Sequence, residues 1–270
     1  MELKILKRSG SVYSDYSSLR DYYGSAKSIS LSNTEYLYLG SPFKFNQFYI
    51  KFSVLSTVSN SLNIELFDGV SWQYVSSIED GTNGFKNSGH VSFIPDKYKT
   101  WQNLDSNFVD SNMPMVYEYY WLRISVTSTL SPVPSISFIG HLFLESDNLL
   151  SGEFPNFANA SFMTAFKTGK TDWEEQRYLA TNLIIERLIQ KNILVDGNQL
   201  LDIKRLRGAT IQKTAQLIFN SMGDDYLDQA NGARDESEKR LHGNLFLIDD
   251  KNTAIVDNQV RTSKQGYLTR

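Results

Sequence analysis

The hydrophobic pattern of this chain changes its period once, near residue 160, and that change limits the fold more than any single motif does. Before it, apolar side chains alternate with polar ones, most clearly over residues 48–54, which read FYIKFSV. After about residue 170 they recur every three or four positions. A period of two fits a half-buried strand, and a period near 3.6 fits a helix. The sequence therefore predicts a β domain followed by a helical domain.

Composition supports this division. Of the 15 tyrosines 12 lie before residue 151, as do three of the four tryptophans, in a background rich in Ser, Asn and Thr. Aromatic residues favour strands, and Asn, Ser and Gly favour the turns between them. Short strands without intervening helices predict an antiparallel β-sandwich of jelly-roll type. The expected strands are 36–39, 48–54, 62–66, 72–75, 90–94, 119–126 and 135–144, with 97–115 as a long connection or flap.

Three helices are expected in the second domain. The first begins at a capping box, Thr171 to Glu174, in which a hydroxyl and a carboxylate would satisfy free backbone N–H groups, and it ends near residue 193. The second spans about 202–222 and is followed by Gly223 as its C-terminal cap. The expected buried stripes are Leu179, Leu183, Leu188 and Ile189 on the first helix, and Ile211, Ala215, Ile218 and Met222 on the second.

The third predicted helix, over residues 225–242, is strongly polar. It carries Asp235/Lys239 and Glu236/Arg240 pairs four residues apart, which stabilise a helix surface. A face of this polarity is either solvated or placed at a subunit interface. The residues expected at a ring interface are Leu227, Ala230, Arg234, Glu236, Arg240 and Leu241.

Residues 244–270 alternate again and predict an extended arm or hairpin. A turn is expected at 249–252, between two short apolar segments. Because an isolated two-stranded ribbon is only marginally stable in water, we expect the arm to dock on another chain. The residues expected to dock on the portal or another neighbour are Leu245, Phe246, Leu247, Ile248, Ile255 and Val256.

The predicted fold class is thus α+β, an N-terminal antiparallel β-sandwich followed by a small helical bundle with an extended C-terminal ribbon. We divide the chain into an N-terminal segment, a sandwich, a linker, a helical domain and an arm. The corresponding ranges are 1–24, 25–150, 151–170, 171–243 and 244–270.

Charge and cysteine content exclude several classes of protein. Residues 1–150 hold 11 Lys and Arg against 14 Asp and Glu, and residues 151–270 hold 16 of each, so neither half is a polycation suited to non-specific nucleic-acid binding. The absence of cysteine excludes a disulfide scaffold, thiolate metal sites and a Cys nucleophile. Assembly in a reducing cytosol is expected. No run of eighteen apolar residues or signal peptide is recognisable, and we expect no membrane partner.

The search for catalytic motifs is negative. Gly169-Lys170-Thr171 precedes a predicted helix as in a phosphate-binding loop, but the required earlier glycine is Thr164. Residues 249–252 lack the glycine and glutamate of a calcium loop. The three histidines, His90, His141 and His242, stand in different elements without metal-ligand spacing. We therefore expect no catalytic residue, no metal and no cofactor.

The aromatic residues of the first domain allow two interpretations. Trp72, Tyr74, Trp101 or Trp121 could stack on a sugar ring, or they could pack in the core and across strands. In the segment 119–124 every side chain is bulky, which favours packing. As an alternative, Trp72, Tyr74 and Trp121 are kept as sugar-stacking candidates.

The first domain resembles β-sandwich modules found in virion proteins of tailed bacteriophages. In outline it is also similar to galactose-binding-like and carbohydrate-binding sandwiches. Such a module implies a decoration or contact surface on the particle. The segments that carry the resemblance are residues 64–75, 80–85, 89–95 and 120–126.

The helical part, about residues 173–260, resembles the head–tail connector, or neck adaptor, proteins of tailed phages. The resemblance rests on residues 183–192, 206–222 and 233–241 with the ribbon behind them. It implies a homo-oligomeric ring, a dodecamer by analogy with the family, that contacts the portal and tail or collar proteins and lets genomic DNA pass. The expected function is a structural virion protein assembled in the host cytoplasm. The alternatives are a carbohydrate-binding or host-recognition module of a baseplate or tail, and a hydrolase with a sandwich accessory domain.

Overall fold

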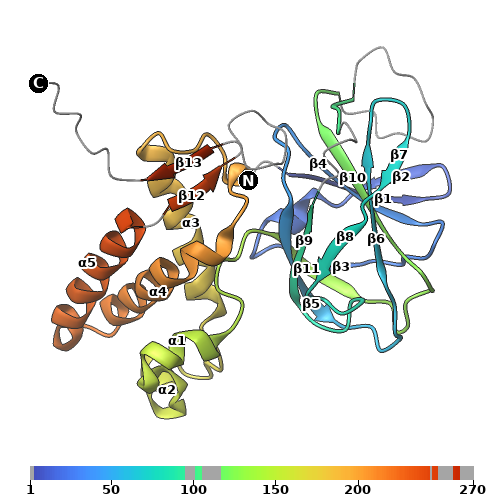
Figure 1. The fold of residues 1–270 in the computed structure, drawn as a ribbon. Coiled ribbons are helices and arrows are strands. Elements are labelled where there is room, and N and C mark those ends of the chain that lie inside the picture. The colour runs from blue at the N-terminus through green and yellow to red at the C-terminus, as the bar shows by residue number, and fades with distance from the viewer. Residues whose placement is uncertain (1–2, 95–100, 105–116, 244, 249–257, 262–270) are drawn as a thin grey trace, which may run out of the picture. The chain divides into compact units, whose positions relative to one another are not determined.

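A computed structural model of the 270-residue chain describes residues 3–94, 101–104, 117–243, 245–248 and 258–261. These residues fall into two compact units (Figure 1). The first is a β-sandwich that ends at Gly140, and the second is a helical unit that begins at His141. The predicted α+β class, with the sandwich first, is confirmed.

Six strands form the first sheet of the sandwich, in the order β2-β1-β4-β10-β6-β7, with every neighbouring pair antiparallel. Residues directly opposite one another follow one row across the sheet: Leu6, Tyr38, Arg123, Glu65 and Tyr74. The strands are β1 (Lys4–Ser9), β2 (Val12–Asp15), β4 (Tyr36–Ser41), β6 (Leu62–Phe67), β7 (Trp72–Tyr74) and β10 (Tyr120–Val126).

The second sheet is also antiparallel and has the order β3-β11-β5-β9-β8. Its central strand β5 is the segment with the clearest alternation in the sequence, and Phe48 and Ile50 on it are fully buried. The strands are β3 (Lys27–Ser28), β5 (Gln47–Val54), β8 (Ser77–Asp80), β9 (Gly89–Ile94) and β11 (Ser135–Gly140).

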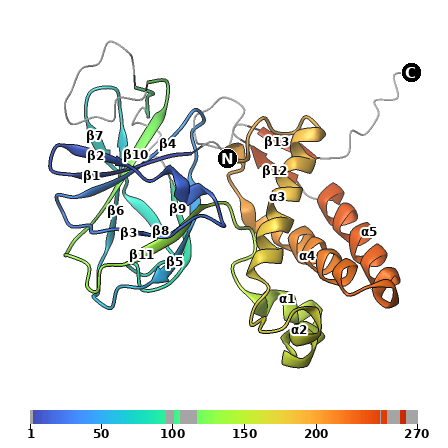
Figure 2. The same ribbon diagram turned by 180° about the vertical axis from the view of Figure 1, so that it is seen from behind.

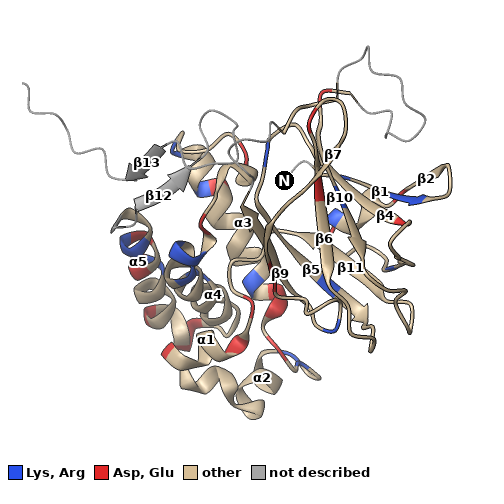
Figure 3. Ribbon diagram, turned by 45° about the vertical axis from the view of Figure 1, so that its right-hand side comes forward, with Lys and Arg blue, Asp and Glu red and all other residues tan. Residues whose placement is uncertain are grey.

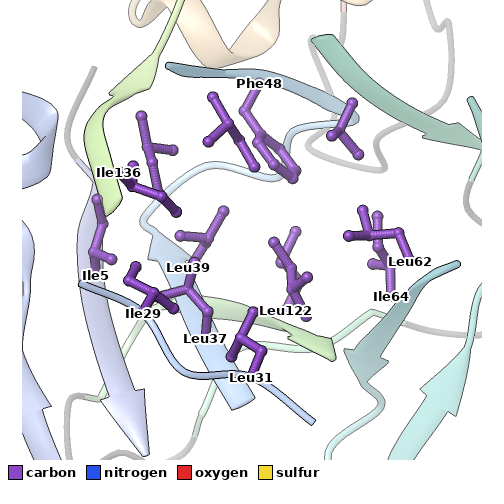
Figure 4. Packing of buried hydrophobic residues seen from close by; sticks show 14 of the residues in the cluster. Ile5, Ile29, Leu31, Leu37, Leu39, Phe48, Leu62, Ile64, Leu122 and Ile136 are labelled. Atoms are coloured by element: carbon purple, nitrogen blue, oxygen red, sulfur yellow. The ribbon is translucent and has the colours of Figure 1, made fainter. Parts of the chain in front are cut away.

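The core of the sandwich lies between the two sheets and is almost wholly aliphatic and aromatic (Figure 4). Leu39 and Leu122 come from the first sheet, and Phe48 and Ile136 come from the second. Burying each such side chain contributes about 1.5–3 kcal/mol. Since every second residue of these strands points inward, the alternation in the sequence directly predicts the core.

The sandwich begins earlier than the sequence indicated. Strand β1 lies between β2 and β4 in the first sheet, inside the segment 1–24 that was set apart from the domain. Leu3 and Ile5 are fully buried, but Lys7, which is also buried, interrupts the apolar pattern. At the other end β11 stops at Gly140, and Phe143 and Leu144 after it belong to the core of the helical unit.

The predicted linker, residues 151–170, is mostly helical. It contains the end of α1 (Asp147–Glu153) and the whole of α2 (Ala160–Phe166). Both short helices have side-chain caps, with Ser146 accepting from the N–H of Asn148, and Asn159 accepting from that of Ser161. The sequence reading failed here because each helix has only seven residues, too few to show a period.

Helix α3 (Glu174–Gln190) starts differently from the predicted capping box. The residue before it is Trp173, whose backbone N–H donates to Asp147 at 2.9 Å. The carboxylate of Asp172, and not the hydroxyl of Thr171, accepts from the N–H of Glu174 at 3.0 Å. The capping-box prediction at Thr171 was therefore wrong, although the helix it announced is present.

The buried face of α3 was also predicted incorrectly. Leu179, Leu183 and Ile189 are 37–38% exposed, and of the predicted stripe only Leu188 is buried. The face turned to the core carries three polar residues, Gln176, Arg177 and Thr181, together with Ala180, Ile184 and Ile185. These buried polar side chains concealed the true stripe, because an apolar-period reading discards them.

Helix α4 (Arg207–Ser221) buries Ile211, Ala215 and Ile218 of its predicted stripe, whereas Met222 follows the helix as its C-cap and is only partly buried. Gly223 follows with φ of +100°, a conformation that favours glycine after a helix end. Helix α5 (Leu227–Gly243) then returns along α4, and α3 packs on α4 as well.

A two-stranded ribbon follows α5, formed by β12 (Leu245–Ile248) and β13 (Asn258–Arg261) (Figure 2). The first strand agrees with the predicted arm. The second was predicted at 253–256, but residues 258–261 pair instead, since strand propensity alone does not determine which segment pairs across a loop. Ile255 and Val256 lie outside the described residues.

Candidate functional site

The helical unit has an open groove over α4, between α3 and α5. Helix α4 contacts both of the other helices, and a cavity of about 250 Å³ remains above it. The lining residues come from all three helices, so no single segment of sequence could reveal the site. They are Leu183, Ile184, Glu186, Arg187, Gln190, Lys213, Ser237, Glu238 and Leu241.

One end of the groove is closed by an ionic cluster around Glu238 of α5. Its carboxylate accepts from Arg187 Nε at 3.1 Å and from Lys191 Nζ at 3.3 Å, both on or just after α3. His242 Nε2 lies 3.5 Å away, one turn further along α5. Burial acts to raise the pKa of Glu238, but Arg187 and Lys191 outweigh it and hold that pKa below its ordinary value of 4.5. The cluster fixes α3 relative to α5.

Lys213, on α4, is the basic group at the floor of the groove. Its ammonium donates to the neutral Gln216 amide at 2.9 Å, and in the part of the chain that the structure describes no carboxylate lies within ion-pair distance. Burial lowers the pKa of Lys213, the nearby Arg187 and Arg234 lower it further, and Glu238 opposes them. An additional carboxylate in the groove would therefore be stabilised.

The α3 side of the groove carries one exposed leucine among polar side chains. Leu183 lines it together with Glu186, Arg187 and Gln190, and it is 37% exposed and belongs to none of the hydrophobic clusters among the described residues. Leu179, one helical turn before it, is equally exposed. An exposed leucine beside the half-buried Lys213 is a surface that an amphipathic segment can cover.

Of the six residues predicted at a ring interface, the structure places two inside the chain. Ala230 and Leu241 are 1% and 2% exposed and pack in the cores of the helical unit, so they are removed from any contact with a neighbour. The sequence reading failed because the inward face of α5 carries small residues apart from Leu241, so no continuous apolar stripe marks it.

The other four predicted interface residues remain at the surface. Glu236 and Arg240 pair at 3.0 Å as expected, and Arg240 also bonds Glu153 at 2.8 Å, so this pair contributes to the chain's own packing. Arg234 pairs with Asp235 beside the groove, and Leu227 is 53% exposed. Charged residues of both signs occur along α5 (Figure 3).

An acidic tip surrounds Leu227 at the start of α5. It comprises Asp224 and Asp225, in the 3-10 turn before the helix, and Asp228 in its first turn. All three aspartates are exposed, and within the described residues none of them has an ion-pair partner. Sequence reasoning did not single out this tip. The sequence does show a leucine among three nearby aspartates, but only the structure shows that the leucine is exposed.

The outer face of the first sheet carries a second distinctive cluster, which is aromatic. Arg123 and Glu65 form a bidentate pair at 2.7 and 2.8 Å in this face, and both side chains are largely buried. The guanidinium lies 4.1 Å from the ring centre of Tyr36 and 4.7 Å from that of Trp72. Burial alone would lower the pKa of Arg123, but Glu65 raises it above its usual value.

This geometry separates the three sugar-stacking candidates. Trp121 is fully buried, and its ring covers Gly40, where any Cβ would lie 2.7 Å from the ring. Trp121 therefore packs and cannot stack on a sugar. Trp72 is half-buried with Arg123 against its ring, and only Tyr74 is well exposed, at 60%. Trp101, at 3% exposure, is also a packing residue.

The loop at Lys170, possible metal sites and possible membrane spans are the remaining features that the sequence search considered. Lys170, in the loop that resembled a phosphate-binding motif, lies over the rings of Phe166 and Trp173. Among the residues with described positions there is no group of three His, Cys, Asp or Glu side chains that could hold a metal ion. No helix in that part of the chain is long and apolar enough to span a bilayer. Residues 249–252 lie outside the described residues.

The comparisons with known proteins identify no relative. No protein-family model matches the chain, and no curated protein matches it either. Function therefore has to be argued from the groove, the acidic tip, the ribbon and the resemblances in the sequence.

Proposed function

We propose that this chain is a structural, non-enzymatic virion protein of a tailed phage, a neck adaptor whose copies form a ring between the portal and the tail. The observation that carries the proposal is the open surface of the helical unit. Its bundle leaves leucines exposed along α3, and its two-stranded ribbon pairs with no third strand among the described residues. Both features suit a chain whose surfaces are completed by neighbours.

Head-to-tail ring assembly requires two different surfaces on each copy, because a closed ring is built from heterologous contacts. The groove over α4 and the acidic tip of α5 are two such surfaces. The sandwich, as a separate unit with its own core, would then be a decoration or a docking surface for collar or tail proteins.

In this proposal the C-terminal arm docks onto the portal by strand addition. A ribbon whose edges are unpaired offers backbone N–H and C=O groups to a partner strand. The ring would assemble in the host cytoplasm, and genomic DNA would pass through it without specific contacts.

Deletion of residues 244–270 tests this role. We expect both units to remain folded, because each has a hydrophobic core built from residues before 244, while attachment to phage heads that lack this protein is lost. Attachment is measured by negative-stain microscopy of heads mixed with purified protein, and folding by circular dichroism.

A chain that ends at Arg261 is the matched control, since it keeps both strands of the ribbon. It should attach as the full chain does. Normal attachment of the chain that lacks 244–270 would show that the arm does not dock on the portal.

A further inference from the structure

The groove and the acidic tip of the helical unit are complementary in chemistry. The groove offers the exposed side chain of Leu183 and, in the same lining, Lys213, a half-buried ammonium without a carboxylate partner among the described residues. The tip offers Leu227, which is 53% exposed, with aspartates on both sides of it. The groove also holds Glu186, and Glu238, which is already paired with Arg187 and Lys191, so Lys213 is the cation in it that lacks a carboxylate within the described part of the chain. An apolar residue flanked by carboxylates fits an exposed leucine next to such a cation.

The two surfaces of one copy cannot meet each other. Leu227 and Ser237, which lines the groove, stand ten residues apart on the same helix, so a rise of 1.5 Å per residue separates them by about 15 Å. Because α5 is a continuous helix packed on α4, the tip can enter only the groove of another copy.

We propose that Leu227 of one copy inserts into the α3–α5 groove of the next, with its flanking aspartates facing Lys213 and Arg187. This contact rests on the proposed function, since it supplies the head-to-tail interface of the ring. It is heterologous by construction, because each copy uses its tip on one side and its groove on the other.

In this contact Lys213 would bind an aspartate of the neighbouring copy and Leu183 would pack on its Leu227. An incoming aspartate would replace water around the Lys213 ammonium, which burial and the neighbouring arginines already disfavour in its charged form. Leu183 would cover Leu227 from the rim. Arg187 would keep its bond to Glu238, so the wall of the groove would remain intact on binding.

Cross-linking tests the contact directly, because the chain contains no native cysteine. The double variant Leu227→Cys/Leu183→Cys is treated with a short bis-maleimide after assembly on heads that lack the protein. We expect a ladder of covalent multimers on a denaturing gel. The control Val70→Cys/Leu183→Cys, whose first position is 81% exposed on the sandwich, should give at least tenfold less.

Mixing the single variants tests the direction of the contact. Leu227→Cys and Leu183→Cys, combined in equal amounts, should give covalent dimers and nothing larger, because each linked pair has only one tip and one groove with a thiol. Strong cross-linking of Leu227→Cys with itself would indicate a two-fold contact and would overturn the proposal.

A charge reversal provides a second readout. Lys213→Glu should reduce cross-linking of the double variant at least tenfold, whereas Lys239→Glu, at an exposed position on α5, should leave it unchanged. If rings form on heads but no ladder appears, the proposed contact is wrong and the proposed function stands. If the unsubstituted chain forms no ring on heads, the proposed function itself fails.

Discussion

At the scale of single residues, the Arg123–Glu65 ion pair is the feature of the sandwich at which a substitution should cost the most stability. Arg123 and Glu65 are 15% and 4% exposed at their side chains, and removing one charge leaves the other buried without a partner. We expect Glu65→Gln to lower the free energy of unfolding by about 3 kcal/mol. Urea denaturation of the full chain, followed by tryptophan fluorescence, measures the change.

The double variant Glu65→Leu/Arg123→Met removes both charges. It therefore shows whether the stability lost in Glu65→Gln comes from leaving Arg123 unpaired or from losing the ion pair itself. Replacing a whole buried ion pair by apolar groups is often neutral, so we expect this variant to lose no more than about 1 kcal/mol. A double variant as unstable as Glu65→Gln would show that the pair itself, and the stacking of Arg123 on Tyr36 and Trp72, stabilises the sheet.

The lowered pKa of Glu238 leads us to expect that the stability of the helical unit depends on pH. Its folded-state pKa lies below 4.5, so its contribution to stability is complete above that pH and is lost as the pH falls through the lowered folded pKa. Since Glu238 is more than a third exposed, Glu238→Gln should cost only about 0.5 kcal/mol at pH 7.

The same substitution should have a smaller effect as the pH falls below 4.5 and through the lowered folded-state pKa, because the native carboxylate then becomes protonated. Thermal unfolding at a series of pH values from 7 downward measures the difference. Glu186→Gln, at an exposed position on the same groove, is the control and should leave the stability at pH 7 nearly unchanged. A destabilisation by Glu238→Gln that grew toward low pH would contradict the assignment.

Single residues also show where sequence reasoning works. Bulky side chains at every position of 119–124 favoured packing over sugar binding, and the full burial of Trp121 confirms that interpretation. The pairing of Arg123 with Glu65 was not predicted, because the two residues are 58 positions apart and meet only through the register of β10 and β6.

At the scale of elements, the packing of α5 on α4 depends on small side chains. Ala230 and Ala233 are buried against α4, and the hydroxyl of Ser237 donates to the carbonyl of Ala209 at 3.0 Å. We expect Ala233→Leu to destabilise the helical unit by about 1–3 kcal/mol, because a larger side chain forces the two helices apart. Chemical denaturation followed by far-ultraviolet circular dichroism measures this.

Gly232→Leu is the control for that substitution, at the neighbouring position. A Cβ there meets no atom within 4 Å, and leucine has a higher helix propensity than glycine, so stability should be unchanged or greater. Equal destabilisation by both leucines would mean that α5 does not depend on close approach to α4.

The elements themselves were predictable where one face is purely apolar. Strand β5 and helix α4 have clean periods, and both were located, although α4 begins five residues later than predicted, after a 3-10 turn at Ile203–Leu206. Strand β1 and the buried face of α3 were missed, because Lys7 in the first and Gln176, Arg177 and Thr181 in the second are buried polar residues. Whether the strand connections form a jelly roll stays a prediction.

At the scale of the whole molecule, the division into a sandwich and a helical unit follows from the change of period in the sequence. The groove cannot be predicted from that change of period, because its lining comes from three helices that are separated in sequence. The interface predicted on α5 stays a prediction, and the structure removes two of its six residues from it. The sequence identified polar residues that face outward, but it could not show that Ala230 and Leu241 face α4 and its surroundings.

Above all, we propose that copies of this chain form a closed ring at the neck of a phage particle. Negative-stain microscopy of the purified full chain, alone and mixed with heads that lack it, examines this proposal. We expect a ring of fixed diameter at the portal vertex, absent when the chain lacks residues 244–270. A chain that stays monomeric and leaves the portal vertex bare would contradict it, as would a fibre-like particle bound elsewhere on the virion.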